Sequence, residues 1–315
     1  MKKFYILSFI LIFLTSFSRA ADKQKIIFDC DLGGDIDDAF ALSLILTSPE
    51  FDVLGIVLEN NNTPERAKVA CKMLYETGRE NIPVVVGEKT GDTMDPQFYW
   101  AEHFDKVKPL TVNATDFIIE NIKKFPGQVI LFTVGPVTNI GRVLDKDPGI
   151  LKMTKHVYSM FGSFYRGYDM GPVPSAEWNV VADTPASKKF ISCGAGLSFA
   201  GLDVTMQVRL DENNIHKLAM RHSPLTDALI GLYTLWGYQS YATPSPVLHD
   251  VLAVGMVLWP DLFTLRKAYV KVTDNGYTVI DESRDPNCEI GMTVKSDELI
   301  KRLMERLLKQ DMERN

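Results

Sequence analysis

The sequence has few cysteines, an excess of acidic over basic residues, and no linker, internal repeat or low-complexity tract. Because 46% of the residues are apolar, 23% are charged, and the 21 Gly and 16 Pro are spread along the chain, disordered, collagen-like and coiled-coil classes are excluded. The cysteines are too few and too scattered for a small secreted scaffold stapled by disulfides. They are Cys30, Cys71, Cys193 and Cys288. A disulfide between two of them is possible, but the fold should not depend on one.

The first twenty residues have the pattern of an export signal. Lys2 and Lys3 precede an apolar run over residues 4–14, and Ser18-Arg19-Ala20 matches a signal-peptidase site. The alternative is a membrane anchor, but this run is shorter than the ~20 residues that span a bilayer. We expect cleavage after Ala20, a mature domain over residues 21–315, and a periplasmic or secreted protein.

Charge narrows the choice of partner. Removing Lys2, Lys3 and Arg19 from 34 basic residues leaves 31 against 40 acidic ones, a formal charge near −9. Nucleic-acid polymers and anionic membranes both need a basic face. We therefore expect no nucleic-acid partner, no membrane partner after cleavage, and a small soluble ligand.

Short apolar runs alternate with helical patterns over the first half of the mature chain. The pattern predicts strands at 25–31, 53–58, 82–87, 128–134 and 156–161, and helices at 37–47, 63–78, 112–124 and 137–144. Thr63 is the expected N-cap of the second helix, with Pro64 at its first position. Strict alternation predicts an α/β fold with an open, doubly wound, mostly parallel sheet of Rossmann-like type.

After Thr205 the pattern is mostly helical, which predicts a helical annex to the same domain. We expect helices at 212–241, 249–258 and 297–312, and a hairpin turn at Asp274-Asn275-Gly276. Residues 89–109 and 163–175 form loops long enough to act as lids. Ligands of such sheets bind beyond the carboxyl ends of the strands, so the chemistry should lie in strand-to-helix turns.

Five carboxylates occur within ten residues at the end of the first strand. They are Asp29, Asp31, Asp35, Asp37 and Asp38. Two carboxylates ~4 Å apart repel by about 4 kcal/mol at an effective dielectric near 20. A helix N-terminus relieves part of this repulsion, and an oxygen-binding divalent ion relieves more.

Other interpretations of this stretch are weaker. One is helix capping with solvated charges. It is disfavoured because Asp29 and Asp31 directly follow an apolar strand, where full solvation of both is not expected. An EF-hand loop counted from Asp29 would have Gly33 at position five and Phe40 at position twelve, where acidic or Asn ligands belong. The glycine pair 33–34 lacks the rest of a nucleotide-binding motif.

Three more segments carry polar groups at strand or helix ends. In the sequence SAEWN at 175–179, Glu177 and Asn179 point the same way if extended, which suits vicinal hydroxyls. In PVLHD at 246–250, Asp250 is a candidate metal ligand and His249 a candidate acid or hydroxyl partner. The turn TVGPVTN at 133–139 offers free carbonyls to a cation. Each segment alone is more often a capping or surface feature.

Taken together and in this order, the segments resemble the inosine-uridine-preferring nucleoside hydrolase family, whose opening motif reads D-x-D-P-G-x-D-D. The resemblance runs from residue 26 to at least residue 250 and includes GLDVT at 201–205. It implies calcium-dependent hydrolysis of the N-glycosidic bond of ribonucleosides, which releases ribose and free base. The family is commonly a homodimer or homotetramer.

The resemblance also implies roles for individual residues. The implied calcium ligands are Asp31, Asp38, Asp250 and the main-chain carbonyl of Val134. The implied ribose-binding residues are Asp37, Asn61, Glu177, Asn179 and His249, with Met160 lining the sugar pocket. Asp31 would be the general base that activates a water held by the ion, and His249 would help the base depart. Carboxylates would stabilise the positive charge that develops on the sugar ring.

The chain departs from the family pattern in ways that leave the substrate open. The opening motif has two extra residues and Leu32 in place of Pro, and Trp178 replaces the commoner Phe. Asp35, in the insertion, is either a further ligand or a solvated group. Four aromatic residues are candidates for stacking on the base, although aromatics at helical spacing are more often core. They are Trp100, Trp236, Tyr238 and Tyr241.

Two other classes of function stay open. One is an exported ribose- or nucleoside-binding protein that keeps the fold and the metal without catalysis. The other is a haloacid-dehalogenase-type phosphatase, which also begins with a strand followed by Asp-x-Asp and uses the first Asp as nucleophile. The phosphatase leaves the segments 177–179 and 249–250 unexplained.

Overall fold

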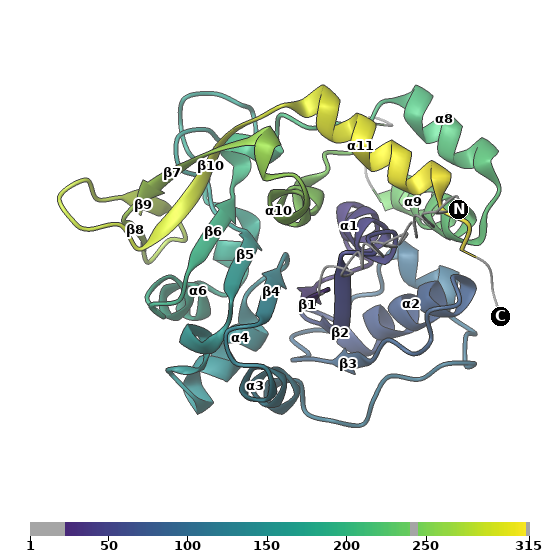
Figure 1. Ribbon diagram of the computed structural model, residues 1–315, viewed down its shortest axis with the longest axis horizontal. Coiled ribbons are helices and arrows are strands. Elements are labelled where there is room, and N and C mark those ends of the chain that lie inside the picture. Colours follow the sequence, from purple (N-terminus) through teal and green to yellow (C-terminus); the bar gives the residue numbers. More distant parts are fainter. Residues whose placement is uncertain (1–22, 240–244, 313–315) are drawn as a thin grey trace, which may run out of the picture.

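The computed structural model describes residues 23–239 and 245–312. An eight-stranded sheet with the order β3-β2-β1-β4-β5-β6-β10-β7 runs through it (Figure 1). Its strands are β1 (Gln24–Cys30), β2 (Phe51–Leu58), β3 (Val84–Val86), β4 (Val129–Thr133), β5 (His156–Met160), β6 (Leu197–Ala200), β7 (Phe263–Ala268) and β10 (Cys288–Val294). All neighbours pair in parallel except β10 and β7. The predicted α/β fold with a mostly parallel sheet is therefore confirmed.

Helices cover both faces of this sheet (Figure 1). The longer ones are α1 (Asp37–Leu46), α2 (Thr63–Glu76), α3 (Ala114–Lys124), α4 (Thr138–Lys146), α6 (Thr184–Ile191), α8 (Glu212–Arg221), α9 (Pro224–Gln239), α10 (His249–Leu258) and α11 (Ser296–Lys309). The short ones are α5 (Trp178–Ala182), α7 (Leu202–Thr205), η1 (Pro96–Ala101), η2 (Ile150–Met153) and η3 (Pro260–Leu262). No helix among the described residues is long and apolar enough to cross a membrane.

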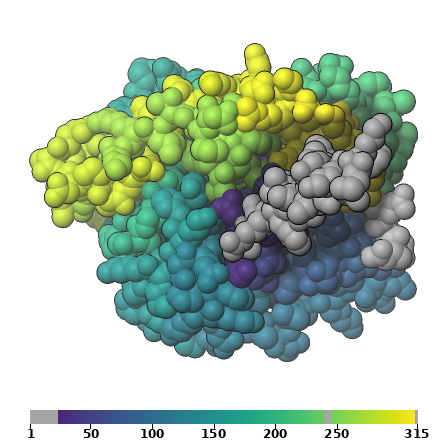
Figure 2. Space-filling view, viewed as in Figure 1, coloured from purple at the N-terminus to yellow at the C-terminus, as the bar shows by residue number. Residues whose placement is uncertain are grey.

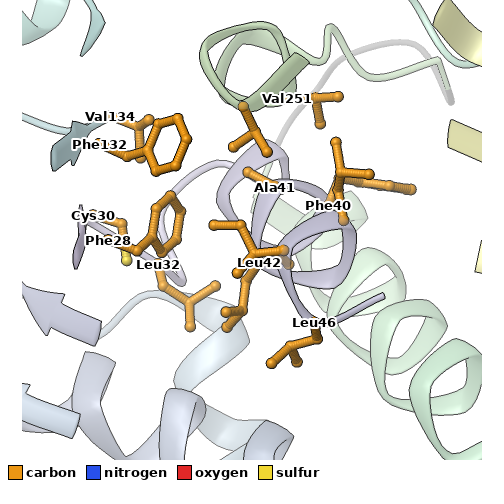
Figure 3. Packing of buried hydrophobic residues seen from close by; sticks show 14 of the residues in the cluster. Phe28, Cys30, Leu32, Phe40, Ala41, Leu42, Leu46, Phe132, Val134 and Val251 are labelled. Carbon is orange, nitrogen blue, oxygen red and sulfur yellow. The ribbon is translucent and has the colours of Figure 1, made fainter. Parts of the chain in front are cut away.

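The strand period of two creates a separate core on each face. In β1, Phe28 and Cys30 belong to the core that includes α1, α2 and α10, while Ile27 belongs to the core that includes α3, α4 and α6. Figure 3 shows the first core, in which Phe28 and Phe132 of the paired strands β1 and β4 belong to the same buried cluster as Leu42 of α1. Helix α1 is buried along its whole length, so the helix that begins at the acidic motif is fixed firmly on the sheet.

Two predictions about helix ends were wrong because of local interactions that the sequence pattern does not show. Helix α2 starts at Thr63 and has Asn62 at its N-cap position. The Thr63 hydroxyl instead donates to the carbonyl of Gly87, 3.0 Å away, and ties the helix to the end of β3. The predicted helix at 212–241 is split into α8 and α9, because His222 adopts a left-handed conformation (φ 51°) just before Pro224.

The C-terminal part combines the helical annex with two strand pairs. The predicted hairpin is formed by β8 (Val270–Val272) and β9 (Thr278–Ile280), with Gly276 at φ 79° in the turn. It projects at one side of the molecule (Figure 2). The four cysteines are buried and unpaired, so no disulfide supports the fold. The predicted signal peptide at 1–20 and Tyr241 lie outside the described residues, and the single domain over 21–315 stays a prediction.

The register of the central strands determines where the functional segments meet. Asp29 of β1 is level with Thr133 of β4, which is level with Ser159 of β5. Since these parallel strands end together, the turns that follow them converge at one edge of the sheet. Helix α10 packs against α1 and β5 and brings the distant segment 249–250 to the same edge.

Candidate active site

A cavity of about 680 Å³ lies at this edge of the sheet. Every residue that the family resemblance implies as a calcium ligand, catalytic group or ribose contact lines it. They are Asp31, Asp37, Asp38, Asn61, Val134, Met160, Glu177, Asn179, His249 and Asp250. The wall also contains residues that sequence reasoning did not assign a role: Gly34, Asn60, Arg66, Thr90, Gly91, Thr93, Asp95 and Tyr168.

Three buried carboxylates form the most compact acidic group in the cavity. Asp37 and Asp38 start helix α1, and Asp250 lies in the first turn of α10. Ligand oxygens of the three lie within 4.8 Å of one another. The backbone amide of Asp250 donates to the carboxylate of Asp37, so two helix N-termini face this acidic group.

Burial and mutual repulsion dominate the electrostatics of this group. Desolvation raises the pKa of Asp37, Asp38 and Asp250 well above the ordinary value, and the neighbouring carboxylates raise it further. A bound divalent cation would reverse both effects, since it supplies the missing opposite charge. Clustered carboxylate oxygens are the donor type that hard cations such as Ca²⁺ prefer. The residues present therefore fit a divalent metal site, and the ion's identity is a separate question.

Asp31 lies beside this group and is held differently. Its backbone amide donates to Oδ1 of Asp38 over 3.2 Å. Its Oδ2 atom accepts a 3.3 Å hydrogen bond from Nδ2 of Asn60 and lies 3.7 Å from Nη2 of Arg66. Its Oδ1 atom lies against Gly135, where an added Cβ would be 2.7 Å away. Only a residue without a side chain leaves room for the carboxylate in this orientation.

Glu177 and Asn179 are fixed by the start of the short helix α5. Glu177 is the N-cap residue and accepts from the backbone amides of Asn179 and Val180, while its other contact is the amide of Gly162 at 3.0 Å. These hydrogen bonds oppose the effect of burial, which nevertheless raises the pKa of Glu177 to about 7. Both side chains are buried and reach the cavity, as the predicted sugar-binding role requires.

The amide of Asn179 also engages the predicted carbonyl ligand. Its Nδ2 atom donates to the Val134 carbonyl over 2.8 Å and to the Met160 carbonyl over 3.1 Å. This amide thus joins the ends of β4 and β5. A carbonyl oxygen has two lone pairs, so the bond from Asn179 leaves Val134 one lone pair for a cation.

His249 is oriented by a residue of the segment GLDVT. Its Nδ1 atom lies 2.8 Å from Oγ1 of Thr205 in α7. Burial, with a smaller contribution from the positive charge of Arg209, lowers the pKa of His249 to about 4. The imidazole is therefore neutral at neutral pH. In the same segment, Asp203 accepts hydrogen bonds from three successive backbone amides at 164–166 and fixes the loop after β5.

In the asparagine run after β2, the side chains of Asn60 and Asn61 have different partners. Asn60 and Asn61 both have positive φ, at 62° and 55°. The Asn61 Oδ1 atom accepts from the backbone amide of Thr93 over 3.1 Å, and the backbone amide of Asn61 donates to Oγ1 of Thr90. The side chain of Asn61 thus braces the loop at 89–95, whereas that of Asn60 reaches Asp31.

Of the four stacking candidates, the three that the structure describes, Trp100, Trp236 and Tyr238, do not line the cavity. Trp236 is a buried core residue, and its side chain hydrogen-bonds the carboxylate of Asp35. Trp100 lies under the ammonium of Lys72, and Tyr238 is 81% exposed away from the cavity. The cavity's own aromatics are Tyr168 and Trp178, and the Tyr168 hydroxyl accepts from the amide of Trp178.

Comparisons with known proteins match this chain over most of its length. The family model for inosine-uridine preferring nucleoside hydrolases matches residues 26–301. A probable uridine nucleosidase 2 of Arabidopsis thaliana is 27% identical and covers 91% of this chain and 98% of its own. A pyrimidine-specific ribonucleoside hydrolase of Escherichia coli O157:H7 is 28% identical over 88% of this chain and 94% of its own. Among solved structures, a plant nucleoside hydrolase has a TM-score of 0.80 at 24% identity, covering 91% of this chain and 99% of its own.

Proposed function

Because this chain belongs to the inosine-uridine preferring nucleoside hydrolase family and is thus an N-glycosidase, we propose that it hydrolyses ribonucleosides to ribose and free base with Ca²⁺ bound in its cavity. The observation that supports this most is the convergence of Asp37, Asp38 and Asp250 under one cavity. Its other wall presents Glu177 and Asn179, a pairing suited to the vicinal hydroxyls of a pentose.

The proposed ligands of the ion are Asp31, Asp38, Asp250 and the carbonyl of Val134. Asp37, which belongs to the same compact group, has a carboxylate that also suits a ribose hydroxyl. When bound, a divalent cation orients oxygen ligands and lowers the pKa of water next to it. The remaining ribose contacts that we propose are Asn61, Met160, Glu177, Asn179 and His249.

The proposed reaction is attack of water on the anomeric carbon of the ribose. Asp31 takes a proton from the water through its Oδ1 atom, because Oδ2 is occupied by Asn60. The bond between the anomeric carbon and the base nitrogen breaks, and its electron pair leaves with the base. The acidic wall stabilises the positive charge that develops on the ring.

His249 is proposed to help the base depart as a neutral group. If the Thr205 hydroxyl donates to Nδ1, the ring proton sits on Nε2 and can hydrogen-bond the leaving base. With its pKa lowered to about 4, the ring carries no positive charge at neutral pH. Final protonation of the base is then supplied through this hydrogen bond or by water.

A phosphatase of the haloacid-dehalogenase type is poorly supported by the site. Its nucleophile would be Asp29, which is fully buried and does not line the cavity. One oxygen of Asp29 accepts a 2.7 Å hydrogen bond from Asn139. The other alternative, a binding protein without catalysis, keeps the same site and differs only in turnover.

A reducing-sugar assay over purine and pyrimidine nucleosides, with and without chelator, tests the proposal. We expect ribose release that stops with chelator and returns with excess Ca²⁺. Tight binding of nucleosides by calorimetry without ribose release would favour the binding protein. Hydrolysis of p-nitrophenyl phosphate in preference to a p-nitrophenyl riboside would favour the phosphatase.

Export and assembly are separate proposals. The pattern at residues 1–20 supports an export signal cleaved after Ala20, which N-terminal sequencing of the secreted or periplasmic protein tests. A homodimer or homotetramer, expected from the family, is tested by light scattering of the purified protein.

A further inference from the structure

Arg66 of helix α2 is a buried cation in an acidic cavity. Its side chain is 3% exposed, yet it contributes to the cavity wall. Among the described residues that line this cavity, Arg66 is the one lysine or arginine, against seven carboxylates. These are Asp31, Asp35, Asp37, Asp38, Asp95, Glu177 and Asp250. A buried guanidinium is costly unless its donors are satisfied, so its partners show what it holds in place.

The guanidinium donates to three backbone carbonyls in two loops. Its Nη1 atom donates to the carbonyls of Asp31 and Leu32, in the loop after β1. Its Nε atom donates over 2.8 Å to the carbonyl of Asn60, in the loop after β2. The ring of Phe98 lies 5.7 Å from the guanidinium carbon and completes its surroundings. Arg66 therefore fixes the backbone of Asp31 relative to that of Asn60.

The remaining edge of the guanidinium faces the side chain of Asp31. Nη2 lies 3.7 Å from Oδ2 of Asp31 and 3.9 Å from Oδ2 of Asp95. Nδ2 of Asn60, whose own backbone Arg66 holds, donates to the same Oδ2 of Asp31. The guanidinium and the amide donor of Asn60 therefore both lie beside one oxygen of the carboxylate. The other oxygen, Oδ1, is left on the side of Gly135 and the Val134 turn.

We propose that Arg66 is a positioning residue that anchors Oδ2 of Asp31 directly and through Asn60, so that Oδ1 is presented to the reacting water. This proposal rests on the proposed role of Asp31 in nucleoside hydrolysis. Lysine would not replace Arg66, because one ammonium cannot span three carbonyls and a carboxylate as the planar fork does. A misplacement of about 1 Å of a reacting group costs roughly 10²-fold in rate.

The test compares Arg66→Lys and Arg66→Met with Arg221→Met in steady-state hydrolysis of uridine and inosine with saturating Ca²⁺. Arg221 is the matched control, because it also donates to backbone carbonyls, those of Leu308 and Gln310, but does not line the cavity. We expect kcat to fall about 100-fold in Arg66→Met and at least about tenfold in Arg66→Lys, with KM within threefold. Arg221→Met should keep kcat within twofold even where its melting temperature falls by the same amount.

Two results would overturn the proposal. One is a kcat within twofold of wild type in either Arg66 variant, and the other is a loss that appears in KM alone or equally in Arg221→Met. If Arg66→Met does not fold by circular dichroism, Arg66→Lys decides by the same criteria. Failure of the proposed function itself is distinct, because the wild-type protein would then release no ribose from any nucleoside.

Discussion

The carboxylates of Asp38 and Asp250 come from the first turns of α1 and α10 and, with Asp37, bring their oxygens within 4.8 Å of one another. Such a group is unstable without a cation, because desolvation and mutual repulsion both oppose its ionisation. We therefore expect the metal dependence, the pH response and the activity of the site to follow from this one arrangement.

Without metal, the protein should lose stability as the pH rises. The folded-state pKa of Asp37, Asp38 and Asp250 is raised above the unfolded value near 3.8, so the folded chain binds more protons between the two values. The contribution of these groups to stability is therefore fully present below pH ~4 and lost as the pH rises. Melting temperatures in chelator at pH 5 and pH 8 measure this. Asp250→Asn should reduce the difference, and an equal difference in that variant would contradict the assignment.

Calcium should stabilise the protein most at high pH. A ligand that binds only the folded state at 100 times its Kd adds about 2.7 kcal/mol to the free energy of unfolding. Binding requires ionised carboxylates, so the shift in melting temperature at fixed Ca²⁺ should grow from pH 5 to pH 8. A Ca²⁺ shift in Asp250→Asn as large as in wild type would place the ion elsewhere.

Asp31→Asn should reduce kcat by about 10² to 10⁴-fold while the protein stays folded and binds nucleoside. The asparagine keeps the shape of the side chain and an acceptor for Asn60, but it loses the ion pair with Arg66 and offers no base. Steady-state kinetics and circular dichroism on the same preparation measure both properties. Unchanged turnover would remove Asp31 from the mechanism.

His249→Ala should lower kcat by a factor that is constant between pH 6 and pH 9. The pKa of His249 is lowered to about 4, so its ring is already neutral over that whole range. Thr205→Val removes the partner of Nδ1 and should give a smaller loss in the same direction. A loss that grows below pH 7 would mean instead that the imidazolium form acts.

Gly135→Ala should displace the carboxylate of Asp31 without replacing any catalytic residue. The added methyl would lie 2.7 Å from Oδ1 of Asp31 and 2.9 Å from Oε1 of Glu59, both closer than real contacts allow. We expect kcat to fall at least tenfold, on the order of the cost of misplacing a reacting group. Gly237→Ala is the control, since nothing lies within 4 Å of its added methyl. Equal activity in the two variants would contradict the tight fit around Asp31.

The fold and much of the cavity were predictable because parallel strands place their carboxyl ends at one edge. Polar groups in the turns directly after such strands, such as the carboxylate of Asp31 and the main-chain carbonyl of Val134, therefore lie at that edge. Arg66 was not predictable, since a lone arginine on an amphipathic helix looks like a solvated charge until the fold buries it. The same applies to the contact of Thr205 with His249, which joins residues 44 positions apart.

The aromatic residues illustrate the opposite error. The helical spacing of Trp236 is compatible with a core residue and with a stacking residue. In the structure Trp236 packs in the core. Tyr168 gave no periodic signal because it lies in the irregular loop after β5, which Asp203 fixes through backbone amides. Such a loop has no sequence pattern from which its position could be inferred.

The most direct measurement is a crystal structure of the protein soaked with Ca²⁺ and a non-hydrolysable ribonucleoside analogue, with the ion located by anomalous scattering. We predict one peak with both Asp38 and Asp250 as ligands and with the analogue's ribose hydroxyls beside it. A peak remote from these carboxylates, or a ribose bound elsewhere, would contradict the account.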